Sequence, residues 1–145
     1  LDEPHVLELP DGKILGAFRI EGANPFTIAL CLSEDGGKTW GEVYPTGVSG
    51  SPPHLMLHSS GALICSYGRR QRPCGERAMV SYDFGKTWED DYVLHNTKNE
   101  DDWDLGYPST VELDDGSLMT VYYQKYKDDE KCSMLYTKWQ LEEKK

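Results

Sequence analysis

The sequence predicts an all-β fold made of β-propeller blades of four antiparallel strands, with about three blades in the chain. Short alternating apolar segments separated by tight-turn residues predict the strands, and no long stretch shows helical periodicity. An internal repeat of roughly 50 residues predicts the blades, because each repeat of a propeller forms one four-stranded sheet.

The repeat aligns three segments: EPHVLELPDGKILGAFR from Glu3, PPHLMLHSSGALICSYG from Pro52 and YPSTVELDDGSLMTVYY from Tyr107. In each segment a proline stands eight residues before a shared glycine, and an aromatic residue stands six residues after it. We therefore expect a single partial propeller domain over residues 1–145, with blades at about 1–49, 50–104 and 105–145.

The strands of each unit are expected in a fixed order. HVLEL and STVEL alternate in polarity and predict first strands, and PDG, SSG and DDG predict a tight turn into the second strand. FTIALCLS, RAMVSY and CSMLYTKW predict third strands. Weaker fourth strands are expected around EVYPTG and DYVLHN, and the third unit ends in SMLYTKWQLEEKK, as a last blade would.

Two similar octapeptides, SEDGGKTW (33–40) and SYDFGKTW (81–88), follow the third strands of the first two units. In such a turn the Asp side chain accepts hydrogen bonds from backbone amides, Gly allows positive φ, and Trp packs between strands. Both octapeptides resemble the Asp box, S-x-D-x-G-x-T-W, of the sialidase/neuraminidase-like (BNR-repeat) superfamily. The resemblance implies the last three blades of a six-bladed propeller, with Asp35 and Asp83 in structural turns away from the active face.

The composition excludes several classes of partner. The net charge of -10 makes nucleic acid and anionic membranes unfavourable partners. No run of 18 apolar residues predicts a membrane span, and the four cysteines form no C-x-x-C pair that would indicate a zinc site. We expect no metal and no cofactor, and the sequence predicts no localisation.

Repeat-equivalent residues occupy equivalent places, and the first strand of each propeller blade lines the central channel. The position before the shared proline is filled by Glu3, Pro52 and Tyr107. The position after the second-strand aromatic is filled by Arg19, Gly68 and Tyr123, and Arg69 and Arg70 follow Gly68. A carboxylate, a tyrosine and arginines that are distant in sequence are therefore expected to converge near the axis.

The resemblance to sialidases extends to these residues. The first segment is similar to the sialidase pattern E-x-x-V-x-E-L-x-D-G-x-L-x-x-x-x-R, which implies that Glu3 is the general base and that Arg19 binds the sialic acid carboxylate. The third segment resembles the one that carries the nucleophilic tyrosine, which implies that role for Tyr107. A second carboxylate-binding arginine is expected from YGRRQRPCGER: Arg70 first, with Arg69 and Arg77 as alternatives.

The implied chemistry is coherent. A sugar acid carries a carboxylate at its anomeric carbon, which would repel a carboxylate nucleophile but not a neutral tyrosine. The tyrosine, with an ordinary pKa near 10, then needs a base and nearby cations to become nucleophilic. Guanidinium groups bind a carboxylate through two parallel hydrogen bonds, which suits the arginines to the substrate.

Two further candidates have alternative interpretations. His54 shares a repeat position with His5, and each is either a hydrogen-bonded structural residue or a ligand contact. Trp103 either stacks on a sugar or lies in a solvated loop, NEDDWD. The sequence also departs from the family, because no segment matches its first Arg or its acid/base Asp. The tyrosine segment ends in VYYQ where Glu is usual, and Pro108 replaces a more usual Ser.

We therefore expect the C-terminal half of an exo-glycosidase that removes terminal sialic acid or a related acidic sugar from glycans and is inactive by itself. The alternatives are a non-catalytic glycan-binding propeller and a purely structural module. Three blades leave two blade faces uncovered, so the expected partners are a carboxylate-bearing sugar and either the remaining blades in cis or a second copy in a homodimer.

Overall fold

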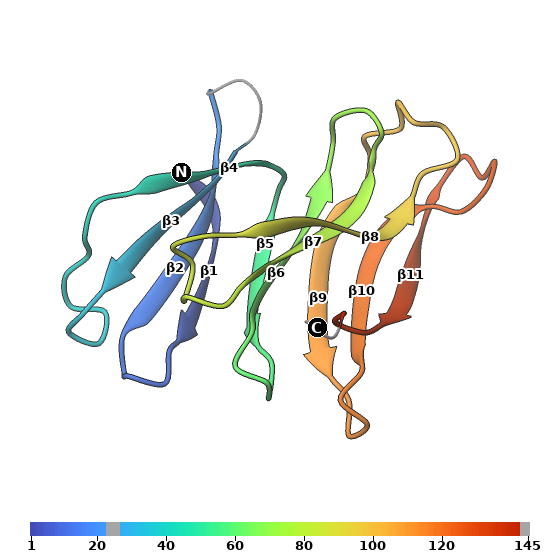
Figure 1. Ribbon diagram of the computed structural model, residues 1–145. Coiled ribbons are helices and arrows are strands. Elements are labelled where there is room, and N and C mark those ends of the chain that lie inside the picture. The colour runs from blue at the N-terminus through green and yellow to red at the C-terminus, as the bar shows by residue number, and fades with distance from the viewer. Residues whose placement is uncertain (23–26, 143–145) are drawn as a thin grey trace.

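The structure is a computed structural model of the chain, and it describes residues 1–22 and 27–142. Within these ranges the chain forms strands and no helix, and the strands are arranged in three antiparallel sheets placed side by side (Figure 1). No helix in the described ranges is long and apolar enough to cross a membrane.

Each sheet is a meander of consecutive strands. The first has the order β1 (Asp2–Glu8), β2 (Ile14–Ile20), β3 (Thr27–Ser33) and β4 (Tyr44–Ser49). The second has the order β5 (Pro53–Leu57), β6 (Leu63–Arg69), β7 (Gly75–Ser81) and β8 (Glu89–Asn96). The third contains β9 (Gly106–Glu112), β10 (Leu118–Lys125) and β11 (Cys132–Trp139). The all-β prediction is confirmed, but within the described residues the third sheet has three strands where four were expected. Phe26, at the start of one expected strand, lies outside the described residues.

The predicted hairpin turn is the same in all three sheets. Gly12, Gly61 and Gly116 have φ of 82°, 87° and 75°, a left-handed conformation that favours glycine. Each glycine N–H donates to the carbonyl three residues earlier, at 2.8–2.9 Å. The shared glycine of the repeat therefore marks the turn between the first and second strands.

The two octapeptides form matching turns after β3 and β7. Asp35 Oδ1 accepts hydrogen bonds from the backbone N–H of Lys38 and Thr39, and Asp35 Oδ2 accepts from the Thr39 hydroxyl at 2.6 Å. Asp83 accepts in the same way from the N–H and hydroxyl of Thr87. The Thr hydrogen bonds lower the pKa of both carboxyls to about 2. These aspartates therefore stabilise turns.

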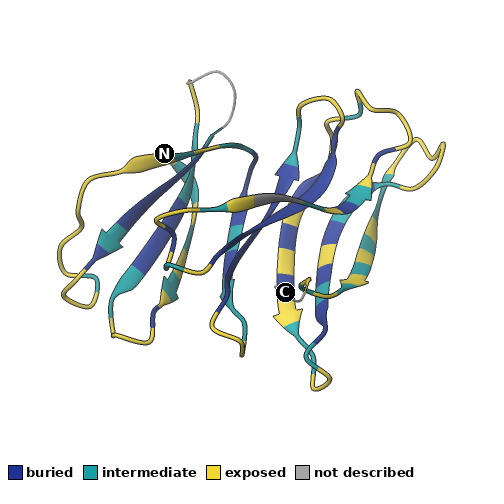
Figure 2. Ribbon diagram, viewed as in Figure 1, coloured by how far each residue is buried: buried dark blue, intermediate teal, exposed yellow. Residues whose placement is uncertain are grey.

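Two apolar layers hold the sheets together. The first lies between the first and second sheets and includes Leu15, Leu30, Leu63 and Met79, and the second lies between the second and third sheets. Every residue of β7 is buried, because this strand lies in the middle sheet with a neighbouring sheet on each side (Figure 2). Burial of this kind contributes roughly 25 cal/mol per Å² of apolar surface.

The first strands of neighbouring sheets lie next to one another: β1 contacts β5, and β5 contacts β9. The fourth strands lie at the opposite edges of their sheets. Strand register also separates two ends of the first sheet. Asp2 pairs with Arg19 at one end, whereas Ile14 pairs with Ser33, at the start of the first octapeptide, at the other. The residues predicted for the site and the octapeptide turns therefore lie at opposite strand ends.

Candidate functional site

Glu3 and Tyr107 share an unusual backbone conformation. Their φ angles are 50° and 53°, which is uncommon for residues other than glycine and costs of order 1–3 kcal/mol each. Each lies beside an irregularity in the strand register, in the β1–β2 pair for Glu3 and in the β9–β10 pair for Tyr107. Two repeat-equivalent residues thus leave the regular strand geometry in the same way.

The side chains of these two residues meet. The Tyr107 hydroxyl donates a hydrogen bond to Glu3 Oε1, across 104 positions of sequence. This contact confirms the expectation that the two side chains approach each other. The other carboxylate oxygen, Glu3 Oε2, lies 3.0 Å from Arg19 Nη1. Arg19 Nη2 in turn donates to Glu21 Oε1 at 3.0 Å. The result is a continuous polar chain from the tyrosine to the arginine.

The surroundings of Tyr107 hold its hydroxyl in the protonated form. The hydrogen bond to Glu3 raises the pKa of Tyr107 above its ordinary value, and burial and the Glu3 charge act in the same direction. The positive charges of Arg70 and Arg19 act in the opposite direction and favour the phenolate. Tyr107 is therefore neutral at neutral pH, with its proton directed at a carboxylate.

Arg70 approaches this pair from the second sheet. It follows the end of β6, and its Nε and Nη2 donate to the Leu105 carbonyl at 3.2 and 3.0 Å. A Cβ on Gly68 would lie 2.9 Å from Gly106 Cα, so a glycine is needed where β6 passes the start of β9. This close approach leaves no room for a side chain at position 68, where the first and third units carry Arg19 and Tyr123.

The structure does not bring the alternative arginines to Glu3 and Tyr107. Arg69 donates to the carbonyls of Gln71 and Arg72 in its own loop. Arg77 is only 3% exposed and donates to the His95 carbonyl and to Asn96 Oδ1 at 2.6 Å. Burial within the second sheet is the physical reason that Arg77 is a structural residue, so its choice as a ligand contact is corrected.

Tyr123 is a neighbour of Tyr107 to which sequence reasoning gave no role. Their ring centroids are 5.9 Å apart, and the Tyr123 hydroxyl donates to Asp104 Oδ1 at 3.1 Å. Burial, with the Asp104 hydrogen bond, raises the pKa of Tyr123 to about 12. The repeat alignment already placed Tyr123 at the Arg19 position. Trp103 is 64% exposed, and its carbonyl accepts a hydrogen bond from the Leu105 N–H.

A small cavity adjoins the tyrosine–carboxylate pair. Its volume is about 210 Å³, and it is lined by Glu3, His5, His54, Tyr107 and the prolines Pro4, Pro52, Pro53 and Pro108. The four prolines are those of the repeat and its neighbours, so all three units contribute to the wall. We define these residues, with Arg19 and Arg70, as the axial site.

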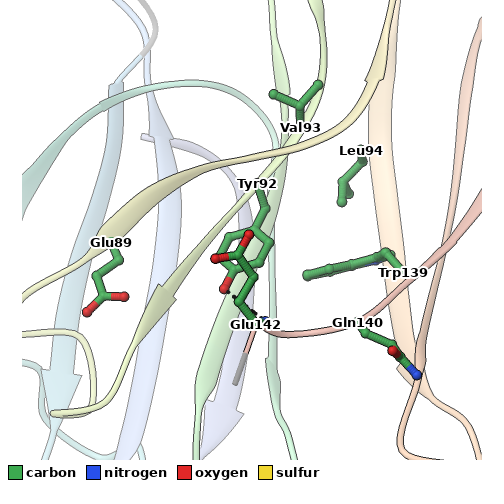
Figure 3. Close-up of a pocket in the computed structure, with 7 residues that line it drawn as sticks. All are labelled: Glu89, Tyr92, Val93, Leu94, Trp139, Gln140 and Glu142. Atoms are coloured by element: carbon green, nitrogen blue, oxygen red, sulfur yellow. Dashed lines mark hydrogen bonds between the residues drawn. The ribbon is translucent and has the colours of Figure 1, made fainter. Parts of the chain in front are cut away.

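A larger cavity of about 470 Å³ lies elsewhere, between β8 and the C-terminal segment (Figure 3). Tyr92 and Trp139 pack there with ring centroids 5.5 Å apart, and the Glu142 N–H donates to the Tyr92 hydroxyl. This cavity contains none of the residues that the repeat places together, so the chemistry favours the axial site. Within residues 1–22 and 27–142, no cluster of three or more His, Cys, Asp or Glu residues could hold a metal ion.

Comparisons with known proteins support the fold. No family profile and no curated protein matches this chain. A solved structure of a protein of unknown function from Dyadobacter fermentans matches 97% of the chain with a TM-score of 0.85 and 27% identity. The chain spans 38% of that protein's length.

Two other solved structures are more distant. An α-L-arabinanase from Penicillium chrysogenum matches 94% of this chain, with 45% of its own length covered, a TM-score of 0.67 and 21% identity. An intramolecular trans-sialidase from Ruminococcus gnavus matches 96%, with 32% of its own length covered, a TM-score of 0.66 and 21% identity. These neighbours are β-propellers, so the three sheets have the arrangement of partial propeller blades.

Proposed function

We propose that the chain carries part of the active site of a sialidase-like exo-glycosidase that acts on terminal sialic acid or a related acidic sugar. The observation that carries this proposal is the hydrogen bond from Tyr107 to Glu3, whose second oxygen is ion-paired with Arg19. A neutral tyrosine from the third sheet meets a base and an arginine from the first sheet, and the tyrosine and the base line one cavity. This combination suits a substrate whose own carboxylate would repel an anionic nucleophile.

In the proposed reaction, Tyr107 Oη attacks the anomeric carbon while Glu3 accepts the phenolic proton. The bond from the anomeric carbon to the leaving oxygen breaks, and water later releases the sugar from the tyrosine. Arg19 and Arg70 bind the substrate carboxylate, with Arg19 exchanging its contact to the exposed Glu21 for the ligand. The acid that protonates the leaving oxygen is assigned to the blades that complete the propeller.

The names of the structural neighbours support a carbohydrate ligand in general terms. They include an arabinanase bound to arabinobiose, a xylan β-1,4-xylosidase and a trans-sialidase bound to oseltamivir carboxylate. The chain spans less than half of each of these proteins, so the complete activity is proposed for a protein that includes further blades.

Calorimetric titration of the chain with N-acetylneuraminic acid and with its methyl ester tests the proposal. We expect the acid to bind more tightly than the ester. Arg19→Gln should weaken binding of the acid about 10-fold or more, because charge-assisted hydrogen bonds contribute roughly 1.5–3 kcal/mol. Tyr107→Phe should leave the affinity within a few-fold, because the ring still fills its place.

Equal affinity for acid and ester, or no effect of Arg19→Gln, would contradict a carboxylate-binding role. Binding that depends on Arg19 but gives no turnover in a protein with the remaining blades would instead identify a non-catalytic glycan-binding module.

A further inference from the structure

Two histidines connect the three first strands in the same way. His5 Nδ1 on β1 accepts the N–H of Leu55 on β5 at 3.1 Å, and His54 Nδ1 on β5 accepts the N–H of Thr110 on β9 at 3.3 Å. These amides are available because β5 and β9 are edge strands of their sheets. Each histidine therefore satisfies a backbone donor of the next sheet.

These contacts fix the protonation of both rings. A ring nitrogen that accepts a hydrogen bond carries no proton, so the neutral ring holds its proton on Nε2. Burial lowers the pKa of His5, and burial with the His5 charge lowers the pKa of His54 to about 4. The ring centroids are 4.4 Å apart, a spacing at which two imidazolium ions would repel each other. Both rings are therefore neutral near pH 7.

Both rings line the cavity that Glu3 and Tyr107 line. Among the residues that the structure describes, neither Nε2 has a hydrogen-bond partner, so two N–H donors remain for a ligand. The rest of the wall is largely proline, which offers no side-chain hydrogen bond. A few fixed polar groups in an apolar wall are typical of a site that orients a small molecule.

We propose that the Nε2–H groups of His5 and His54 bind hydroxyl oxygens of the sugar held beside Tyr107, and so select a polyhydroxylated ring. This inference rests on the proposed function and adds to it the residues that would bind the hydroxyls of the sugar ring. In the proposed function, Arg19 and Arg70 bind the carboxylate of the same sugar. Neutral donors suit this task because they bind hydroxyl acceptors without adding a positive charge that would compete for Glu3.

A pair of substitutions separates ligand binding from the structural contact. In His54→Asn the side-chain oxygen replaces Nδ1 as an acceptor for Thr110, but nothing replaces Nε2. In His54→Gln the amide nitrogen replaces the Nε2 donor, but the acceptor is lost. Ser109→Ala is the matched control, because Ser109 fills the same repeat position in the third unit and is exposed.

The variants are titrated calorimetrically with N-acetylneuraminic acid and with neutral arabinobiose, and unfolded in urea. We expect His54→Asn to retain the unfolding midpoint and to lose about 3- to 10-fold in affinity, the effect of one hydrogen bond. His54→Gln should lose stability and keep more of the affinity. In ¹⁵N NMR spectra of the rings, the Nε2–H tautomer should be present, and the Nε2 signals should shift when sugar binds.

The outcomes distinguish this inference from the proposed function. Binding of the acid that depends on Arg19 but is unchanged in His54→Asn overturns the histidine role and leaves the proposed function standing. Equal binding of both sugars that depends on His54 supports the histidine role and overturns the preference for acidic sugars. Failure of both sugars to bind at about 10 mM overturns both proposals.

Discussion

Single residues decide the geometry of the axial site. Glu3 and Tyr107 both adopt positive φ, and this shared departure from strand geometry accompanies their hydrogen bond. The middle unit has Pro52 at the same position, and proline cannot adopt that conformation. The repeat therefore supplies two polar groups and one proline wall residue from three equivalent positions.

Glu76 is a buried carboxyl whose surroundings raise its pKa. Its side chain is fully buried, and within the described residues neither carboxylate oxygen has a hydrogen-bond partner. Burial raises the pKa of Glu76 to about 8, although the charges of Arg70 and Arg77 act to lower it. The folded chain therefore holds this carboxyl protonated at pH values where the unfolded chain ionises it.

Because the folded state binds this proton more tightly, protonated Glu76 contributes to the free energy of unfolding. We predict that this contribution is fully present below about pH 4.5 and is lost as the pH rises to about 8. Between these values the folded state binds one more proton, so stability should fall by up to about 1.4 kcal/mol per pH unit. Glu76→Gln should remove this slope, because the amide does not titrate. Urea unfolding of both proteins at pH 5 to 9 measures it.

Titrating groups other than Glu76 contribute equally to the unfolding free energies of the wild-type chain and the Glu76→Gln variant. Their contributions therefore cancel when one free energy is subtracted from the other. A difference in unfolding free energy that stays constant from pH 5 to pH 9 would show that Glu76 has an ordinary pKa.

At the scale of elements, Gly68 controls how closely β6 and β9 approach. A Cβ there would meet Gly106 Cα at 2.9 Å and the Ser51 carbonyl at 3.0 Å, and both are backbone atoms that cannot rotate away. We predict that Gly68→Ala lowers the free energy of unfolding by about 1–3 kcal/mol, the usual range for overpacking. It should also weaken acidic-sugar binding, because Arg70 is held by the Leu105 carbonyl beside this contact.

Gly41→Ala is a suitable control, because it removes the same backbone freedom and its nearest contact is a carbonyl at 3.3 Å. Equal stability of the two variants would contradict the importance of the close approach.

Much of the element pattern was predictable from local chemistry. The glycine of PDG, SSG and DDG requires a turn, and the octapeptides contain the donors and acceptors of their own turns. The sequence placed Arg70 first, but it did not show that Arg77 is a buried residue, because burial depends on the assembled sheet. Arg77 is buried, and only the assembled sheet shows that it donates to the His95 carbonyl and to Asn96 at the end of β8. The register irregularities beside Glu3 and Tyr107 could not be predicted either, because the alternation of polar and apolar residues gives no sign of them.

At the scale of the whole molecule, the third sheet presents an apolar face to solvent. Met134 and Tyr136 on β11 are 74% and 67% exposed, and Val111 and Val121 on the adjoining strands are also exposed. Exposed stretches along the strands of this sheet are yellow in Figure 2. Register places Val121 beside Tyr136, so these side chains share one face. In a propeller such a face packs on the next blade, which agrees with a chain that spans 38% of its Dyadobacter neighbour.

We predict that the 145-residue chain in isolation associates through its open faces. Sedimentation velocity at increasing concentration should show a rising mean mass, and the double variant Met134→Lys, Tyr136→Lys should show less association. A chain that stays monomeric at high concentration and unfolds cooperatively would contradict this prediction, because it would show that the exposed apolar faces do not drive association.

The central claim is that Tyr107 is a nucleophile activated by Glu3, and covalent trapping tests it most directly. In a 2,3-difluoro analogue of N-acetylneuraminic acid the leaving group is fluoride, which departs without a proton, so the reaction does not need the proposed acid that protonates the leaving oxygen. The C2–F bond breaks, Tyr107 Oη bonds to C2, and the phenolic proton passes to Glu3. Peptide mass spectrometry should find the sugar on Tyr107, no adduct in Tyr107→Phe, and an unchanged adduct in Tyr123→Phe. An adduct on another residue, or none while calorimetry shows the sugar bound, would contradict the claim.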